Sequence, residues 1–357
     1  MNDDAELSAL LDPADAIYDP LPLPGAGNTS LRFRTLWSFA AGSPSLGRVA
    51  EAHHDAIAIL REAGRTDHSR HLHAVWAAGG PDPLQLQRLG NRWHLRGSKH
   101  WCSAATLARR ALVTAHTSNG TEALVLVDLS HDGVRPQPPD WQSPAMTSVD
   151  TRTVHFDIDI DTGHIIGVDD WYLTRPGFWH GAVGVAACWA GCVDGIVDRL
   201  ATSWKSDPHA CAHLGAIDAA MWNLHAIINA AANDIDTTPI GTAEARQQRA
   251  LRVRHLVDTT VGEVLARIQR ALGPGPLAHT RDLHRHITET DLYRRQSHAE
   301  RDLETLGELA MQAQLRTTGA TGRPGGDDHD EASETSPELC RSDQSRRDFV
   351  ADRHRVV

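Results

Sequence analysis

The hydrophobic pattern near the N-terminus predicts two helices. Between residues 31 and 64, apolar side chains recur at intervals of three and four residues, which is the spacing of one helix face. The sequence GSPS at 42–45 interrupts this pattern, and serine followed by proline is typical of the start of a new helix. We therefore expect two amphipathic helices that are joined by a short capped turn.

From about residue 72 the apolar residues follow a β-strand pattern. Short runs rich in valine, leucine and isoleucine are separated by glycine, proline, asparagine and aspartate, which are typical of turns. The clearest runs lie at 111–115, 123–129 and 153–160. We expect residues 72–168 to form a β-domain.

One of these runs, HFDIDID, also suggests a calcium loop, because Asp157, Asp159 and Asp161 occupy alternate positions. The glycine and the terminal glutamate of such a loop are not at the required offsets. Alternating apolar and acidic residues are what a strand with one face in water shows, and we expect a strand here.

A helical period returns after Arg175 and continues to about Gln314, with few helix-breaking residues. Alanine and glycine on the inner faces let helices approach closely, as in a four-helix bundle. After Gln314 the chain is poor in apolar residues and rich in Gly, Ser and Asp, which predicts disorder. The expected units are a shortened N-terminal helical domain at 1–71, a β-domain at 72–168, a helical bundle at 169–316 and a disordered tail at 317–357.

Composition and charge exclude several classes of protein. The 357 residues are 41% hydrophobic, enough for a sizeable core, and carry a formal net charge of -11, which argues against a nucleic-acid partner. No apolar run approaches the roughly 20 residues of a membrane helix, and the N-terminus is acidic where a signal peptide would be basic. We expect a cytoplasmic protein that does not bind membranes.

Cysteine and histidine usage does not indicate a metal site. The five cysteines show no metal-type pairing, and Cys188 and Cys192, one helical turn apart in an apolar stretch, are expected to be buried thiols. The 22 histidines include His68, His71 and His73, but no HExxH motif occurs, and we expect no metal. The GxSxG, GxxxxGK[ST] and GxGxxG motifs are also absent, which removes the main support for simple hydrolase, NTPase and Rossmann interpretations.

Several segments together resemble a known family. Residues 91–115 contain a strand, Gly97, Lys99, an aromatic residue two positions on, a hydroxyl residue two further on and then another strand. The helical stretch 39–64, the strand VHFDIDIDTGHIIG and the closing segment 271–307 fit the same pattern, so that the chain resembles acyl-CoA dehydrogenases over about residues 31–312. The resemblance implies an α+β multidomain fold with N-terminal helices, a central β-domain and a C-terminal antiparallel four-helix bundle.

The resemblance also implies an FAD site. Trp101 would stack against the isoalloxazine ring, and the Ser103 hydroxyl would bond its polar edge. Family members usually carry Thr-Glu-Pro-Gly-x-Gly-Ser-Asp between the first two strands, whereas this chain has AVWAAGGPDP. Without those side-chain donors, the segment with Trp76, Ala77 and Ala78 would reach the cofactor through its backbone N–H groups.

The catalytic base has several candidates by the same resemblance. Many family members have a glutamate four positions after the tyrosine of the last helix, and this count from Tyr293 reaches Ser297, which is a poor base. The alternatives are His180 on the first bundle helix, and Glu300 and His298 near Ser297.

The family's activity would be oxidation of the CH-CH group of an acyl-CoA-like thioester by FAD, with electrons passed to an acceptor protein. A homodimer or homotetramer is implied, because the neighbouring subunit completes the flavin cleft in this family. Two alternatives are a flavin-dependent monooxygenase, which needs a dry pocket and a small donor such as Ser103 or His298, and a non-catalytic subunit that pairs with a complete homologue.

Overall fold

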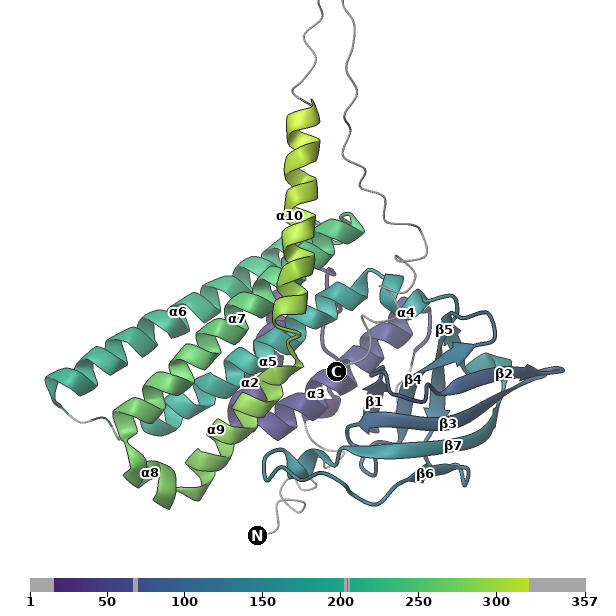
Figure 1. The fold of residues 1–357 in the computed structure, drawn as a ribbon, viewed down its shortest axis with the longest axis horizontal. Coiled ribbons are helices and arrows are strands. Elements are labelled where there is room, and N and C mark those ends of the chain that lie inside the picture. Colours follow the sequence, from purple (N-terminus) through teal and green to yellow (C-terminus); the bar gives the residue numbers. More distant parts are fainter. Residues whose placement is uncertain (1–15, 67–69, 202–203, 205, 321–357) are drawn as a thin grey trace, which may run out of the picture.

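A helical part and a sheet lie side by side in this protein (Figure 1). The computed structural model describes residues 16–66, 70–201, 204 and 206–320. In the order of the chain, helices come first, then a sheet, then a long helical region. This is the order that the sequence predicted.

The two predicted N-terminal helices are confirmed. After a short 3-10 turn, η1 (Ala16–Tyr18), the chain forms α2 (Thr29–Gly42) and α3 (Pro44–Glu62). Ser43 separates these helices: its hydroxyl accepts a hydrogen bond from the backbone N–H of Leu46 at 3.4 Å, and Pro44 occupies the first turn of α3. A serine cap followed by proline starts a helix because it satisfies one N–H group and removes another.

Within the described residues, eight strands form one sheet. They are β1 (His73–Trp76), β2 (Gln85–Leu89), β3 (Arg92–Cys102), β4 (Arg110–Thr117), β5 (Glu122–Asp128), β6 (Val134–Pro136), β7 (Arg152–Ile160) and β8 (Ile165–Gly167). The order is β6-β7-β3-β2-β4-β5-β8, and β1 pairs in parallel with β4. Asp157 and Asp159 are exposed between buried residues of β7, so the prediction of a strand with one wet face is confirmed.

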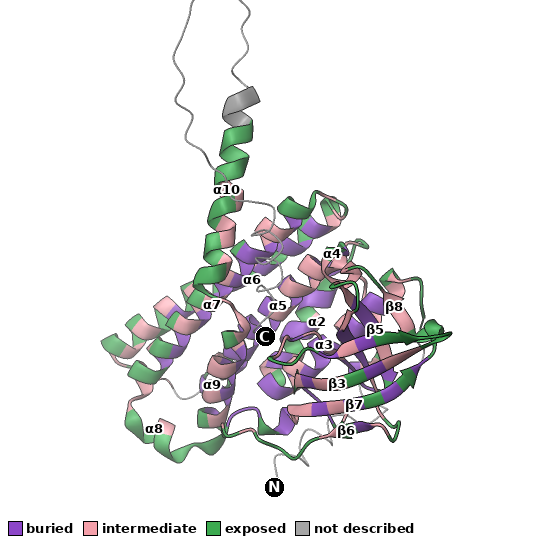
Figure 2. Ribbon diagram, turned by 45° about the vertical axis from the view of Figure 1, so that its right-hand side comes forward, coloured by how far each residue is buried: buried purple, intermediate pink, exposed green. Residues whose placement is uncertain are grey.

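The helical region consists of α4 (Trp171–Thr174), α5 (Gly177–Leu200), α6 (Pro208–Thr237), α7 (Ala243–Leu272), α8 (Pro274–His279), α9 (Arg281–Tyr293) and α10 (Glu300–Ala320), with the 3-10 turn η4 (Arg294–Gln296) before α10. Helix α5 is its centre, packed against α2, α7 and α9. Burial colours in Figure 2 show the inner faces of α5 and α6 buried.

Glycines allow α5 and α2 to approach closely. A Cβ atom added at Gly191 or Gly195 would overlap the backbone carbonyl groups of Trp37 and Ala41 in α2. Cys188 and Cys192 lie buried on the same helix as free thiols, as the sequence predicted. Helix α5 is long and apolar enough to cross a membrane by length and composition alone, but 72% of its most apolar window is buried inside the molecule.

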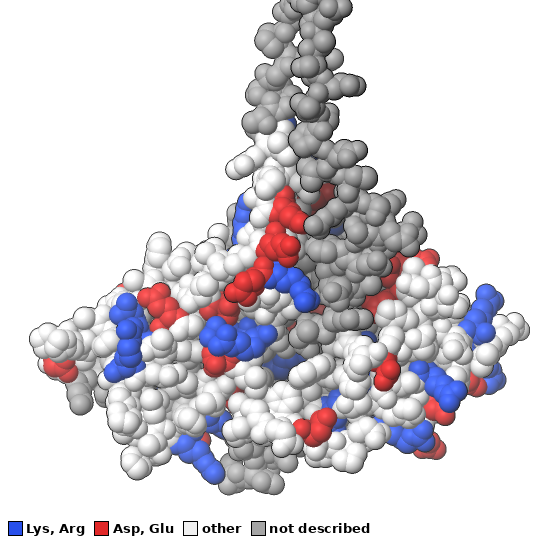
Figure 3. Space-filling model, in the orientation of Figure 1, with Lys and Arg blue, Asp and Glu red and all other residues white. Residues whose placement is uncertain are grey.

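Helix α10 projects away from the rest of the molecule (Figures 1 and 2), and most of its described side chains are exposed or half-buried. Figure 3 shows acidic side chains gathered along it, whereas both signs of charge are mixed over the rest of this face. The helix continues to Ala320, past the boundary predicted at 316. From 321 onward the predicted disordered tail lies outside the described residues.

Candidate active site

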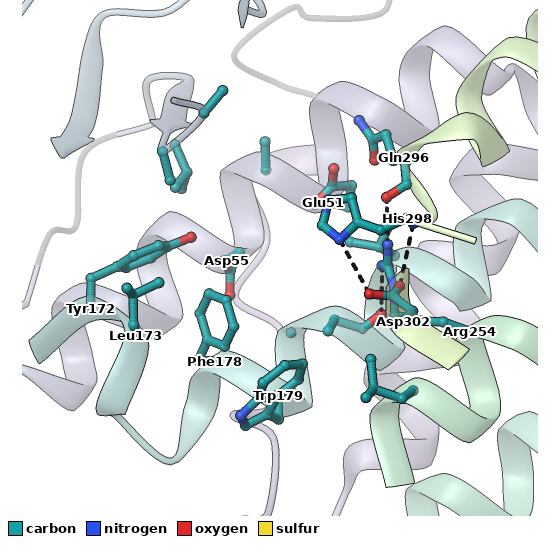
Figure 4. Close-up of a pocket in the computed structure, with 18 of the residues that line it drawn as sticks. Glu51, Asp55, Tyr172, Leu173, Phe178, Trp179, Arg254, Gln296, His298 and Asp302 are labelled. Atoms are coloured by element: carbon teal, nitrogen blue, oxygen red, sulfur yellow. Dashed lines mark hydrogen bonds and ion pairs between the residues drawn. The ribbon is translucent and has the colours of Figure 1, made fainter. Parts of the chain in front are cut away.

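A cavity of about 440 Å³ lies between the sheet and the helices. Its walls come from α3, the segment after β1, the end of β3, α4, α5, α7 and the start of α10. The residues therefore come from both ends of the chain. Figure 4 shows Tyr172, Phe178 and Trp179 on one side of the cavity, with Asp55 beside them, and Glu51, Arg254, His298 and Asp302 on the other.

The sheet contributes Ala77, Ala78 and Trp101 to the cavity. Trp101 is 51% exposed although it is a large aromatic residue, and its ring makes an edge contact with Trp141 at 6.2 Å between centroids. Its φ of 59° lies in the left-handed region, which a bulky side chain rarely adopts. Such backbone outliers cluster at functional sites, where the surrounding structure holds them.

Helices α4 and α5 provide an aromatic wall. Tyr172, Phe178 and Trp179 all line the cavity, and the Phe178 ring makes edge contacts with Tyr172 at 5.4 Å and with Trp179 at 5.1 Å. Burial and the nearby Asp55 raise the pKa of the Tyr172 hydroxyl above its usual range. This wall suits a planar, apolar ligand, because aromatic rings prefer such offset and edge contacts.

Glu51 lines the cavity from α3. Its carboxylate accepts a hydrogen bond from Arg48 at 2.7 Å, and both side chains are only about a tenth exposed. Burial is the main cause that raises the pKa of Glu51 to about 7, against the lowering effect of Arg48. This carboxyl group therefore gains and loses a proton near neutral pH.

The start of α10 adds His298 and Asp302, whose Nδ1 and Oδ1 atoms are 3.2 Å apart. Burial acts to raise the pKa of Asp302, but the hydrogen bond from His298 and the charge of Arg254 hold it below its usual value. A carboxylate at Nδ1 fixes the orientation of the imidazole ring, as in many catalytic pairs.

Arg254 lies between Glu51 and the His298–Asp302 pair, and together these residues form the charged wall of the cavity. Its guanidinium donates to the carbonyl of Gln296 at 2.7 Å and lies over the Trp189 ring at 4.6 Å from its centroid. Both Glu51 and Asp302 interact with its charge. The cavity thus contains a run of acid, cation and acid that ends at His298.

The predicted cofactor residues divide into two groups. Trp101, Ala77 and Ala78 meet at the cavity, but Trp76 and Ser103 are not part of its lining. Trp76 is 1% exposed, and its indole N–H donates to the carbonyl of Ser103 at 2.9 Å. The Ser103 hydroxyl lies 3.2 Å from the Thr151 hydroxyl. Both residues therefore lie outside the cavity lining and bond to the backbone and side chains next to it.

The candidate bases divide in the same way, and helix geometry is the reason. His298 lines the cavity, whereas Glu300 is exposed and lies two positions, about 200°, around α10 from Asp302, which lines it. His180 is likewise two positions from Phe178 on α5, and it is buried outside the cavity lining. Burial, then Arg249 and Arg246, lower the pKa of His180 to about 4. Ser297 does not line the cavity either.

Sequence reasoning missed Glu51, Asp302 and the aromatic wall. A signal was available on α3, where Arg48, Glu51 and Asp55 recur at three and four positions within an otherwise apolar helix face. No group of three or more His, Cys, Asp or Glu residues in the described part of the chain could hold a metal ion, and His68 lies outside that part.

Solved structures that this chain matches include enzymes in complex with FMN. The complex of TdsC from Paenibacillus sp. A11-2 with FMN and indole matches with a TM-score of 0.73 at 16% identity, over 81% of this chain and 84% of TdsC, which is a dibenzothiophene monooxygenase. The methanesulfinate monooxygenase MsuC from Pseudomonas fluorescens matches with a TM-score of 0.71 at 18% identity, over 87% and 88% of the two chains. KijD3, in complex with FMN and a dTDP-linked amino sugar, matches with a TM-score of 0.69 at 15% identity over 79% of each chain.

No protein-family model matches the sequence, and no curated protein matches it either. At these low identities the similarity between structures establishes the fold. It is the fold of the acyl-CoA dehydrogenase-like flavin enzymes, as the sequence resemblance predicted.

Proposed function

We propose, from this fold and from the cavity between sheet and helices, that the protein is a flavin-dependent monooxygenase of a small aromatic molecule. The observation that carries the proposal is the composition of the cavity. One wall consists of Tyr172, Phe178 and Trp179, and the opposite side offers the His298–Asp302 pair. Structural neighbours that are monooxygenases favour the same chemistry.

A flavin fits the residues on the sheet side. The exposed indole of Trp101 offers a face for stacking, and the small side chains of Ala77 and Ala78 leave room for a planar ring. A bound reduced flavin supplies two electrons, so that the substrate and O2 become the hydroxylated substrate and water while the flavin is oxidised. The His298–Asp302 pair would hold or move a proton beside the reacting atoms. We propose FMN in place of the FAD expected from the sequence, because TdsC and KijD3 bind FMN.

Oxidation of an acyl-CoA-like thioester by FAD is the second candidate, and Glu51 is the observation that favours it. A carboxyl group with a pKa of about 7 in the cavity is suited to abstracting an α-proton. Against it stands the charge balance of the cavity. Arg48 is paired with Glu51, and Arg175 lies 2.9 Å from Glu62 and 3.5 Å from Asp55, so these cations are already neutralised and do not favour the phosphates of CoA.

Binding and reaction with oxygen test both candidates. The purified protein is titrated with FMN and with FAD, and the flavin fluorescence reports affinity. The flavin-loaded protein is then reduced without oxygen and mixed with isotopically labelled O2 and indole as a probe. Labelled oxygen in the product supports the monooxygenase. Flavin reduction by a short acyl-CoA in the absence of oxygen supports the dehydrogenase instead, and failure to bind either flavin contradicts both.

A further inference from the structure

Glu51 occupies a position that the proposed chemistry leaves unexplained. It lies in the middle of α3, whereas His298 lies just before α10 and Asp302 in the first turn of that helix. Its side chain is about a tenth exposed, and the part that remains open faces the cavity that it lines. A buried carboxyl group costs free energy, so a structure that keeps one at a cavity wall offers a polar partner to whatever binds there.

Charged and titratable groups surround Glu51 from several helices. On α3 itself, Arg48 attracts the carboxylate and Asp55, one turn further on, repels it. Arg254 from α7 is the third charge that acts on it. The other groups coupled to Glu51 are Arg32 from α2, Tyr172 from α4, Cys188 from α5 and Tyr293 from α9. Cations hold the carboxylate in place, and burial keeps its protonated form accessible near neutral pH.

The remainder of the wall narrows the class of ligand. Phe178 and Trp179 present aromatic surface in half-buried positions, and Leu251 and Val185 add apolar surface. Arg48 and Arg175 already have carboxylate partners, and Arg254 lies near Asp302 and Glu51, so acids balance these three cations. A neutral, planar molecule therefore matches the cavity, and the Glu51 carboxylate, which accepts a hydrogen bond from Arg48, can accept another from a polar hydrogen on it.

We propose that Glu51 recognises the substrate by accepting the hydrogen of a weakly acidic O–H or N–H group on a planar aromatic ring. The ring would lie against Tyr172, Phe178 and Trp179. The hydrogen of the substrate O–H or N–H group is shared with a carboxylate oxygen of Glu51 in a hydrogen bond, and the proton stays on the substrate atom. No bond is broken and no electron leaves the substrate, so this contact needs no oxidant. The inference rests on the proposed function in one respect, that the cavity holds the substrate.

Calorimetric binding of phenol to the purified full chain tests this inference. Ionised Glu51 is the better acceptor, so phenol affinity should rise as pH increases through 7. If binding lowers the pKa of Glu51 by about one unit, the dissociation constant falls about fivefold between about pH 6 and about pH 8. Anisole has the same ring but no O–H group, and its affinity should not change over this range.

Variants separate recognition by Glu51 from general effects of charge. The affinity of Glu51→Gln for phenol should not depend on pH. Glu51→Asp, which keeps a carboxyl group, should retain part of the pH dependence of the parent. Asp55→Asn is the matched control, because Asp55 lines the same cavity one turn away on the same helix. It should keep the dependence with a shifted midpoint. Circular dichroism confirms that each variant is folded.

The inference is overturned if phenol binds the parent no better than anisole does at high pH, or if the pH dependence survives in Glu51→Gln. Flavin affinity, measured separately by fluorescence, keeps this result distinct from the proposed function. A protein that binds phenol through Glu51 but binds no flavin would retain the inference and lose the monooxygenase. A protein that binds flavin and oxygenates indole, with no pH dependence for phenol, would do the reverse.

Discussion

At Trp101 a left-handed backbone and an exposed indole occur together, and this residue should dominate flavin affinity on the sheet side. Trp101→Ala removes a stacking surface worth about 0.5 to 1.5 kcal/mol, so FMN should bind about threefold to tenfold more weakly. Fluorescence titration measures the change. Trp93→Ala, at the other end of β3, is the control and should bind FMN as the parent does. Equal affinities of parent and Trp101→Ala would place the flavin elsewhere.

His180 should affect stability in acid. Its folded pKa of about 4 lies below the ordinary value of 6.5, so between these values the unfolded chain binds a proton that the folded chain does not. The contribution of His180 to stability is therefore fully present well above pH 6.5 and is lost as the pH falls towards 4, by roughly 3 kcal/mol.

The variant His180→Met removes the titrating group and leaves a flexible apolar side chain. Urea unfolding at pH 7 and at pH 4.5 compares the two proteins. The parent should lose more stability than the variant on acidification. Equal losses would mean that His180 has the same pKa in the folded and unfolded protein. The buried imidazole would then not cause the loss of stability in acid.

At the scale of elements, the contact between α2 and α5 depends on glycine. Gly191→Ala or Gly195→Ala places a methyl group against the α2 backbone and should lower the free energy of unfolding by about 1 to 3 kcal/mol. Gly215→Ala in the exposed part of α6 is the matched control, since no atom lies within 4 Å of its added Cβ. It should raise stability by up to about 1 kcal/mol through helix propensity. Urea unfolding of the three variants would contradict this account if all changed alike.

The same elements show what could be predicted from the sequence. Helices α2 and α3 and the strands β4, β5 and β7 were predictable, because a helix face and a half-buried strand each leave a periodic pattern. Strands β6 and β8, of three residues each, are too short to leave one. The sequence also predicted small residues on the inner face of α5, but it did not show that they would contact α2.

The site was harder to predict than the fold. Trp101, Ala77, Ala78 and His298, which the sequence analysis proposed as site residues, all line the cavity. His180 and Glu300 do not line it, because two positions along a helix turn a side chain to another face. Glu51 was missed, although Arg48 and Asp55 share its helix face, because the cavity that it lines is completed by α7 and α10, which are distant in sequence. Spacing along the chain carries no information about such neighbours.

At the scale of the whole molecule, we expect a homodimer or a homotetramer. Three large apolar side chains are well exposed: Trp222 on α6 is 74% exposed, and Met311 and Leu315 on α10 are 64% and 65% exposed. Exposed apolar side chains of this size are candidates for a contact between subunits. Sedimentation at micromolar protein should show the oligomer, and Trp222→Glu should weaken it if α6 forms the interface. Gln247→Glu, a half-buried residue of α7 at the cavity, is a charge-matched control that should leave the oligomer intact. A monomeric parent would contradict the expectation.

Residues 298–305 complete the lining of a cavity to which α3 also contributes, and α3 leaves the ribosome long before them. At about 5 to 20 residues per second, the nascent chain exists for on the order of ten seconds or more with α3 made and α10 still unmade. During that time Glu51 and Arg48 lack the final wall that separates them from water. A message that ends early, or a protease cut between η4 and α10, would yield a protein whose α2, α3 and α5 can still pack together but whose cavity is open. The cavity is thus completed only when the growing chain reaches its last lining residues.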